Sequence, residues 1–409
     1  MVRSSERVER EHDVSEVKDL NKGKTFSERR ILRPGERFVA TGLFLLLIAG
    51  RPADSSIQAF HRAFGPKSSL LVSSPTLQWE VWPSDGAHVT SADMFLNGKP
   101  VNAIYNTKLR RVEYRPERPF MAGTYRVQCR VMVDDRLEVK KDWSFQVSTE
   151  AISSLPEPEE SQYIALAETN AFRQTLGLDT VHQETRLNAA SLAHVKYLAL
   201  NRRTGHYEKP GEPGFVGATP SDRLEAFGYS GGSWECVTYN SGGIKESVRD
   251  LFHAPYHRIP FLQPGDVPVG TGMTGKHFSI KFGESGDSGL SISPAAGQSG
   301  VPTSWDGNET PNPLRMHSGF GSEVGYPIVF SFFGDYPVVK LNRASVTCKG
   351  VDVPIFENAS ENDDHLENSI ILIPKKPLKP NTTYSVSVEA MVNRKKKIQQ
   401  NWSFTTGSK

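Results

Sequence analysis

Cysteine is scarce in this chain of 409 residues, which contains only Cys129, Cys236 and Cys348. More than a hundred residues separate each cysteine from the next. This spacing offers no closely spaced pair for a local disulfide and no Cys-x-x-Cys metal motif. We therefore expect the stability of the fold to come from packing.

An excess of charge of either sign is also missing. The chain has 48 Lys and Arg residues against 46 Asp and Glu residues, which gives a formal net charge of +2. Nucleic-acid binding proteins attract the phosphate backbone with a clear positive balance, and this chain has none. We therefore expect no nucleic-acid partner.

Long hydrophobic runs are missing too. The apolar run 38-FVATGLFLLLIAG-50 lies between Arg37 and Arg51, and at about a dozen residues it is shorter than the roughly 20 that a bilayer span needs. Its length favours the h-region of a signal peptide over a buried core helix, and an uncleaved membrane anchor is the alternative. We therefore predict a disordered charged segment at 1–37 and an extracellular or cell-surface protein.

An internal repeat organises the chain beyond residue 70. Residues 116–148 and 374–407 both contain Pro-x-x-Pro, an alternating Tyr-x-Val strand pattern, a charged turn and a final Trp-Ser-Phe. Alternation with a period of two is typical of half-buried antiparallel strands. The repeat predicts two all-β sandwich modules of immunoglobulin-like size, at 71–149 and 290–407.

Between these modules the period of the apolar residues changes from two to nearly four. Helices are predicted over 162–179, 185–201 and 243–254, and the last must end by Pro255. A β-hairpin is predicted over 267–283. Helices that flank a small antiparallel sheet form an α/β/α sandwich, and the whole chain is predicted to be α+β.

The central region resembles the CAP superfamily, which comprises the cysteine-rich secretory proteins, antigen 5 and the pathogenesis-related proteins of group 1. The resemblance covers 155–288, and the flanking modules resemble the immunoglobulin-like modules of bacterial members. It rests on ordered motifs: Asn170, Leu178, Leu187-x-x-Ala190-x-x-x-His194, 205-GHYE-208, Arg223-x-x-x-x-Gly228-Tyr229, Glu235, 255-PYHR-258 and Val269-Gly-x-Gly272.

This resemblance implies a cleft in which four side chains converge. They are His206, Glu208, Glu235 and His257, with Glu212 as a substitute for Glu208. Two imidazoles with carboxylates suit a divalent cation such as zinc. A glutamate beside a metal-bound water would permit metal-assisted hydrolysis. Alternatively, the four side chains pair acid with base and hold the wall of the cleft in shape.

Three neighbouring groups are expected to be structural. His194 lies on the apolar face of a predicted helix and is interpreted as a satisfied, semi-buried histidine. Cys236 follows Glu235, whose charge would raise the pKa of the thiol, so we expect it to pack rather than react. His253 lies at the end of a helix, where the dipole favours an imidazolium.

These patterns favour an exported or cell-surface protein that binds a cation or small ligand in its His/Glu cleft. The immunoglobulin-like modules would act as spacers or dock the protein to a cell-envelope polymer or surface protein. A metal-assisted, peptidase-like hydrolase is the alternative, but no Ser or Cys with a partner base supports it.

The run 394-RKKKIQQ-400 is predicted to be a solvated hairpin tip, and 284–326 a linker and loop. We also expect each module to fold separately, including a fragment of about 155–288.

Overall fold

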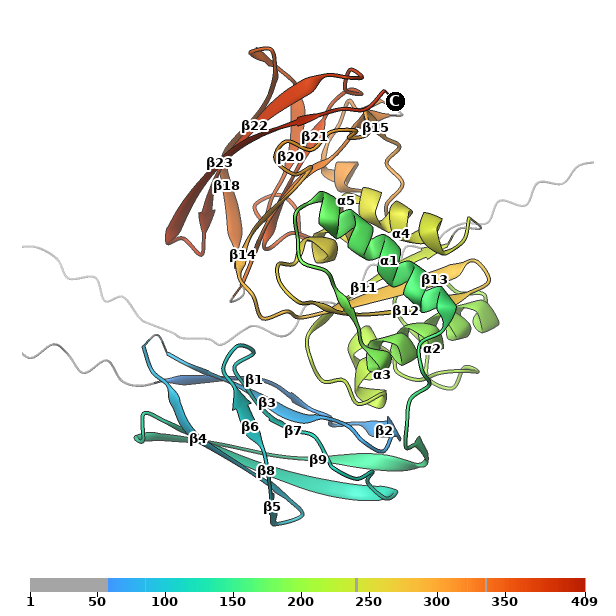
Figure 1. The fold of residues 1–409 in the computed structure, drawn as a ribbon, viewed down its shortest axis with the longest axis vertical. Helices are drawn as coiled ribbons and strands as arrows, with labels where there is room; N and C mark the ends of the chain where they lie inside the picture. Colours follow the sequence, from blue (N-terminus) through green and yellow to red (C-terminus); the bar gives the residue numbers. More distant parts are fainter. Residues whose placement is uncertain (1–57, 85, 240–241, 322, 335–336, 409) are drawn as a thin grey trace, which may run out of the picture. The chain divides into compact units, whose positions relative to one another are not determined.

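The fold is described by a computed structural model. It covers residues 58–84, 86–239, 242–321, 323–334 and 337–408. The segments predicted at 1–37 and 38–50 lie outside these described residues. Within them, no helix has the length and apolar character needed to cross a bilayer. The described part is α+β, as predicted, with a small helical region between two all-β regions (Figure 1).

The first β-region is a sandwich of two sheets whose strands are mostly antiparallel. Their strand orders are β1-β3-β7-β6 and β2-β9-β8-β4-β5. Trp79 on one sheet and Val127 on the other are fully buried in the core between them. The strands are β1 (Ala59–Gly65), β2 (Ser69–Val72), β3 (Leu77–Pro83), β4 (Val89–Leu96), β5 (Lys99–Val101), β6 (Ile104–Asn106), β7 (Arg111–Tyr114), β8 (Gly123–Val133) and β9 (Leu137–Ile152).

This sandwich begins before the predicted boundary at residue 71. Strand β1 pairs with β3, and β2 pairs in parallel with β9. Both pairings shift register, β1 between His61 and Phe64 and β2 between Leu70 and Val72. A register shift interrupts the alternation of side chains that marks a strand in a sequence. The alternation of side chains therefore does not reveal the first two strands in the sequence.

The repeated segments form matching hairpins, β8–β9 and β22–β23. In the first turn, Asp134 and Asp135 have φ angles of 48° and 54°; in the second, Asn393 and Arg394 have 51° and 56°. Two successive residues with positive φ are the mark of a type I′ turn, whose twist matches that of a hairpin. The hairpin tip predicted at 394–400 is confirmed for Arg394 and Lys395, whereas residues 396–400 belong to strand β23.

The central region is an α/β/α sandwich around the sheet β10-β12-β13-β11. Helices α1 and α4 cover one face, whereas α2 and α3 cover the other (Figure 1). Its elements are α1 (Glu160–Thr175), β10 (His182–Gln183), α2 (Thr185–Asn201), α3 (Pro220–Ala226), β11 (Ser233–Tyr239), α4 (Ile244–His253), α5 (Pro255–Arg258), the 3-10 helix η1 (Ile259–Leu262), β12 (Pro268–Thr274) and β13 (His277–Gly283).

Two features of the central sequence have a clear physical reason. Helix α4 ends at His253, and Pro255 opens the separate short helix α5, because proline suits the first turn of a helix but not its interior.

Strand β12 carries Gly270 and Gly272 directly beneath α2. A Cβ at these positions would lie 2.2 Å and 2.4 Å from backbone nitrogens of α2. The two glycines therefore allow the helix to pack on the strand.

The last β-region is a second sandwich with sheets β14-β17-β21-β20 and β19-β18-β22-β23. The 284–326 region, predicted as linker and loop, contains β14, which pairs with β17. The elements are β14 (Gly289–Ser293), β15 (Ser304–Trp305), the 3-10 helix η2 (Pro313–Met316), β16 (Val324–Gly325), β17 (Ile328–Phe333), β18 (Val339–Cys348), β19 (Val351–Asp352), β20 (Ile355–Asn358), β21 (Ser369–Pro374), β22 (Thr383–Val392) and β23 (Lys396–Thr405).

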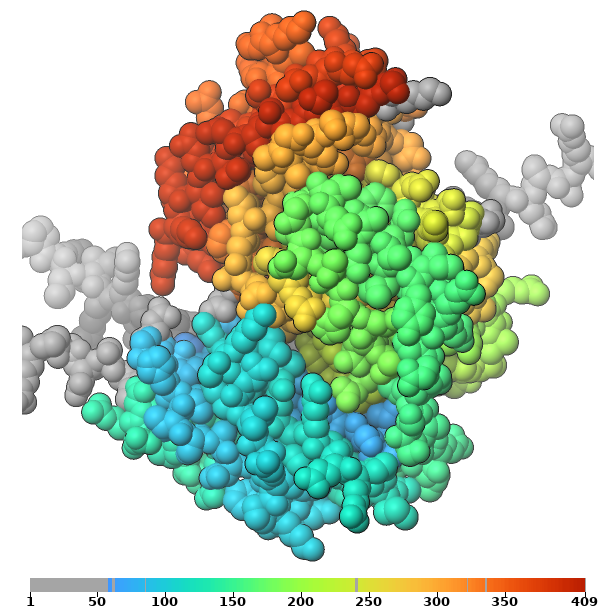
Figure 2. All heavy atoms as spheres, in the orientation of Figure 1, coloured from blue at the N-terminus to red at the C-terminus, as the bar shows by residue number. Residues whose placement is uncertain are grey.

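The central region and the last sandwich share one hydrophobic cluster. Ile259 and Leu262 of η1 pack with Trp305, Leu314 and Phe333 of the last sandwich. All five are buried. Figure 2 shows the atoms of the two regions in direct contact. The polar segment near 284–290 therefore does not separate two independent cores.

Candidate functional site

Strand β11 places Glu235 on the face of the sheet that α2 and α3 cover. Its partner across the sheet is Lys281 of β13, and the two side chains form an ion pair on that face. Both side chains are almost completely buried. Burying an amine and a carboxylate together is tolerable only when each neutralises the other.

Two further cationic or polar groups reach Glu235. Arg223 of α3 donates from Nη2 to both carboxylate oxygens, at 2.9 and 3.0 Å, and His206 Nδ1 lies 2.9 Å from Oε1. Burial by itself would raise the pKa of Glu235, but Lys281, the bond from His206 and the charge of Arg223 outweigh it. They hold the pKa of this carboxyl well below its usual range. Glu235 is therefore an ionised carboxylate whose oxygens are occupied.

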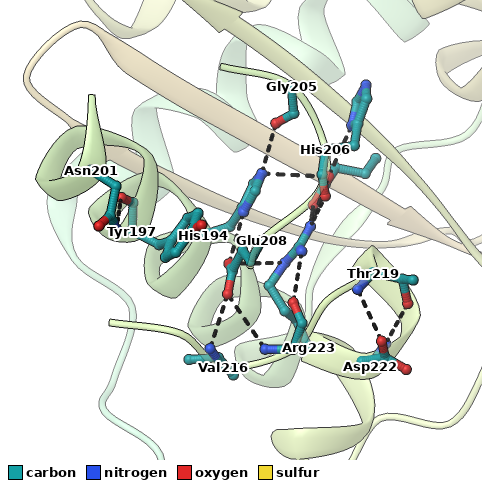
Figure 3. Close-up of polar contacts among 12 residues, drawn as sticks. His194, Tyr197, Asn201, Gly205, His206, Glu208, Val216, Thr219, Asp222 and Arg223 are labelled. Carbon is teal, nitrogen blue, oxygen red and sulfur yellow. Dashed lines mark hydrogen bonds and ion pairs between the residues drawn. The ribbon is translucent and has the colours of Figure 1, made fainter. Parts of the chain in front are cut away.

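Glu208 lies in the same network but deeper. Its side chain is completely buried, and it accepts hydrogen bonds from the backbone of Val216 and from His194 Nδ1, both at 2.9 Å (Figure 3). The Nε atom of Arg223 lies 3.5 Å from the same carboxylate. Arg223 thus bridges the two glutamates, and Glu208 has no oxygen directed to solvent.

His194 is a buried link in this network, as the sequence predicted, and its side chain is fully covered. Its Nε2 lies 3.0 Å from the carbonyl of Gly205, while Nδ1 faces Glu208. Glu212, the predicted substitute for Glu208, lies elsewhere, in contact with Arg203 and Tyr197. Glu208 and not Glu212 therefore belongs to the cluster.

His206 is the exposed end of the network. Its side chain is 39 % exposed. It comes from the loop between α2 and α3, directly after Gly205, which has a φ of 92°. Glu235 occupies Nδ1, and within the described residues Nε2 has no hydrogen-bond partner. The ring can therefore offer Nε2 to a ligand.

His257 has a different carboxylate partner from the one the sequence suggested. Its Nδ1 lies 2.6 Å from Glu309 Oε1, and Glu309 belongs to the loop between β15 and η2 of the last sandwich. Glu309 is completely buried, whereas His257 is 17 % exposed. As in His206, the contact occupies Nδ1 and leaves Nε2 without a partner among the described residues.

The structure thus joins three of the four predicted site residues, His206, Glu208 and Glu235, and gives His257 a partner outside the quartet. Cys236, the residue after Glu235, has its Sγ 3.7 Å from the carbonyl oxygen of His257. Metal ligation by the quartet stays a prediction.

Among the described residues, the quartet does not bring three potential ligand atoms within 4.8 Å of one another, and one different cluster does. Asp363, Asp364 and His365 bring ligand atoms within 4.8 Å of one another. The guanidinium of Arg315 already occupies it, with Nη2 2.9 Å from Asp363 and 2.5 Å from Asp364. This cluster is therefore an arginine-binding ion network.

The sequence-based prediction for Cys236 is confirmed, whereas the one for His253 is wrong. Cys236 is buried, and burial, followed by the charges of Glu235 and Glu309, raises the pKa of its thiol, which confirms a packing role. At His253 the predicted form was an imidazolium. Burial, followed by the charges of Arg258 and Arg249, lowers the pKa of His253 to about 4, so the helix dipole is outweighed.

Sequence reasoning missed the basic partners and one acidic partner. Lys281 carried no distinct signal, because it continues the polar face of β13, which it shares with His277 and Ser279, opposite the apolar Phe278 and Ile280. Arg223 was noticed as a motif residue but given no role. Glu309 carries no signal, since it lies in a loop of polar and small residues 52 positions beyond His257.

The central region of the chain matches a known protein family. The sequence profile of the Cysteine-rich secretory protein family (CAP) matches residues 166–277. No curated protein sequence matches the chain significantly.

Solved structures provide weak likenesses. An extracellular protein containing an SCP domain from Bacillus anthracis shares 12% identity, covering 55% of this chain and 67% of its own, with a TM-score of 0.27. An outer surface protein from Borrelia burgdorferi shares 18% identity over 33% of this chain and 99% of its own, also with a TM-score of 0.27. Scores this low carry no argument about function.

The matched profile spans α1 to the start of β13 and contains His194, His206, Glu208, Glu235 and His257. Residues 166–277 therefore form a CAP domain.

Proposed function

We propose that the CAP domain binds a divalent cation, such as zinc, or a small polar ligand through His206 and His257. The supporting observation is that a buried carboxylate engages Nδ1 of each ring, Glu235 for His206 and Glu309 for His257. Histidines that bind metals in proteins almost always donate their other ring nitrogen to a carboxylate, a carbonyl or water. In each ring the carboxylate on Nδ1 leaves Nε2 available as a donor to a cation.

In this proposal, the glutamates lie behind the histidines and do not bind the cation directly. Glu235 already accepts from Arg223, Lys281 and His206. Glu208 is fully buried. A cation at the two imidazoles would complete its coordination with water or with oxygen atoms of a ligand.

Binding is favoured over hydrolysis by the same contacts. A general base must be able to take a proton from water or substrate. Glu235 is held ionised by two cations, and Glu309 accepts two backbone N–H groups besides the ring of His257. Cys236, the nearest thiol, is buried with a raised pKa. These contacts therefore support a binding role for the domain, in what we propose to be an exported or surface protein.

Isothermal titration calorimetry with zinc and manganese at neutral pH tests this proposal. We expect saturable binding to the wild-type protein and its loss in His206→Ala and His257→Ala. His182→Ala is the matched control, because His182 also contacts a carboxylate, Asp266, through Nδ1 at 2.5 Å, but its side chain is 51 % exposed.

Equal heats for the wild type, His206→Ala and His257→Ala would contradict the proposal. Circular dichroism of each variant shows whether it is folded. Unfolding of His257→Ala would assign that histidine a structural role instead.

A further inference from the structure

The end of α4 and the segment that follows it contact the last sandwich through side chains. His253 Nδ1 lies 2.9 Å from the Tyr326 hydroxyl, and the guanidinium of Arg258 donates to the carbonyl of Pro327 at 2.8 Å. Between them, the Tyr256 hydroxyl donates to Asp363 at 2.5 Å. Residues 253–258, which lie in the CAP domain by sequence, therefore belong to an interface between two modules.

Within this interface, Glu309 satisfies the start of helix α5. Ala254 precedes the helix and has no side chain that could cap it, and Pro255 has no N–H. The next two N–H groups, of Tyr256 and His257, donate to the Glu309 carboxylate at 3.2 and 2.9 Å. Uncapped N–H groups at a helix start need such an acceptor, and the positive end of the helix favours a carboxylate.

The same carboxylate also orients the imidazole of His257. Its Oε1 lies 2.6 Å from Nδ1, and the Glu309 side chain is completely buried. A buried carboxylate is costly unless donors surround it. The ring of His257 must therefore carry its proton on Nδ1 when neutral, which leaves Nε2 as a lone-pair donor.

We infer that Glu309 is a positioning residue of the CAP site, and that the CAP domain and the last sandwich build this site together. Glu309 fixes the backbone, the ring orientation and the tautomer of His257. The last sandwich is then part of the binding site and not merely a spacer. The inference rests on the proposed function for its ligand, but the effect of Glu309 on His257 can be measured without any ligand.

The test is nuclear magnetic resonance of the full chain labelled with ¹⁵N-histidine, combined with zinc titration. The signals of His257 are assigned with His257→Gln. In the wild-type protein we expect the Nδ1–H tautomer of His257. In Glu309→Gln we expect a shift toward the Nε2–H tautomer and a zinc affinity lower by roughly tenfold to a hundredfold.

Two variants serve as controls. Tyr256→Phe removes the contact with Asp363 in the same interface but keeps the backbone bond to Glu309. Glu357→Gln neutralises an exposed glutamate of the same sandwich, on β20. Both are expected to leave the His257 tautomer and the zinc affinity as in the wild type.

The outcomes separate the two claims. A wild-type tautomer in Glu309→Gln would overturn the inference, as would an equal change in Tyr256→Phe, which would indicate general loosening of the interface. If the tautomer changes only in Glu309→Gln but the wild-type protein binds no zinc, the positioning role stands and the proposed function fails.

The fold of Glu309→Gln is checked by its amide spectrum. If it does not fold, the measurement moves to Glu309→Asp, whose shorter carboxylate keeps the charge but cannot reach both the backbone and the ring. A wild-type tautomer and zinc affinity in Glu309→Asp would then overturn the inference. A changed tautomer would support it.

Discussion

Two histidines in one short segment, His253 and His257, have opposite surroundings. His257 faces a buried carboxylate, whereas His253 faces the hydroxyl of Tyr326 and lies near the cations Arg258 and Arg249. Burial and those cations lower the pKa of His253 to about 4. His253 is therefore neutral at neutral pH, and its Nδ1 accepts a hydrogen bond from Tyr326.

The depressed pKa of His253 predicts acid sensitivity. In the unfolded chain a histidine has a pKa of about 6.5, so unfolding takes up a proton between that pH and about 4. The stabilising contribution is complete above about 6.5 and is lost as pH falls through this window, by about 3 kcal/mol at most. Urea unfolding at several pH values, compared between the wild type and His253→Gln, measures this difference.

Only the wild type should show this part of the loss, because glutamine does not titrate and can still accept from Tyr326. Identical pH dependence of the wild type and His253→Gln would show that His253 titrates normally in the folded protein.

Among the elements, the two repeated hairpins share a turn geometry that Asp and Asn tolerate but Arg394 does not. Asp134, Asp135, Asn393 and Arg394 all have left-handed φ angles. Such angles cost roughly 1–2 kcal/mol for most residues, although aspartate and asparagine tolerate them better than arginine does. Arg394 is therefore the strained member of the second turn.

Replacing Arg394 by glycine is expected to stabilise the protein. Glycine adopts a φ of 56° without steric cost, and Asn-Gly is the preferred pair for a type I′ turn. After the added entropy of the unfolded chain is subtracted, the gain should be about 0.5 kcal/mol in free energy of unfolding. Thermal or urea unfolding of Arg394→Gly measures it.

The adjacent Lys395 supplies the matched control for this turn. It is not among the residues with positive φ, so Lys395→Gly should lower the stability by about 0.5–1 kcal/mol. A loss of stability in both variants would mean that the backbone of Arg394 is unstrained.

In the whole molecule, the CAP domain and the last sandwich behave as one packed unit. Besides the shared cluster of Ile259 and Leu262 with Trp305, the fully buried guanidinium of Arg258 depends on the carbonyl of Pro327. Removing the last sandwich would expose the apolar cluster and take a partner from a buried cation. Both effects destabilise a fold.

A fragment of residues 155–288 is therefore expected to be molten or aggregated, contrary to the expectation from sequence. A fragment of 155–408 should unfold cooperatively, because it keeps the interface. The fragment 58–288 is the control and should fail as well, since the first sandwich does not replace the lost contacts. Dye binding to exposed apolar surface and thermal unfolding distinguish these cases, and a cooperative transition of 155–288 would show that the interface is dispensable.

Much of the fold follows from local pattern. The spacing of apolar residues predicted α2 at its observed bounds, and α4 to within a residue at each end; the alternation in the repeated segments predicted the hairpins β8–β9 and β22–β23. The short helix α3 and the edge strand β11 carry too few periodic residues to be recognised. Strands β1 and β2 were missed because their register shifts disturb the alternation.

By itself, the sequence determined the α+β class and the CAP motifs, and the resemblance carried by those motifs singled out His206, Glu235 and His257. Periodicity and motifs are properties of short segments, in which neighbouring positions act together. Only the tertiary structure decided which groups meet. Lys281 reaches Glu235 across 46 residues and Glu309 reaches His257 across 52. Contacts at such separations depend on how sheets and modules pack, and neither periodicity nor motif spacing encodes that packing.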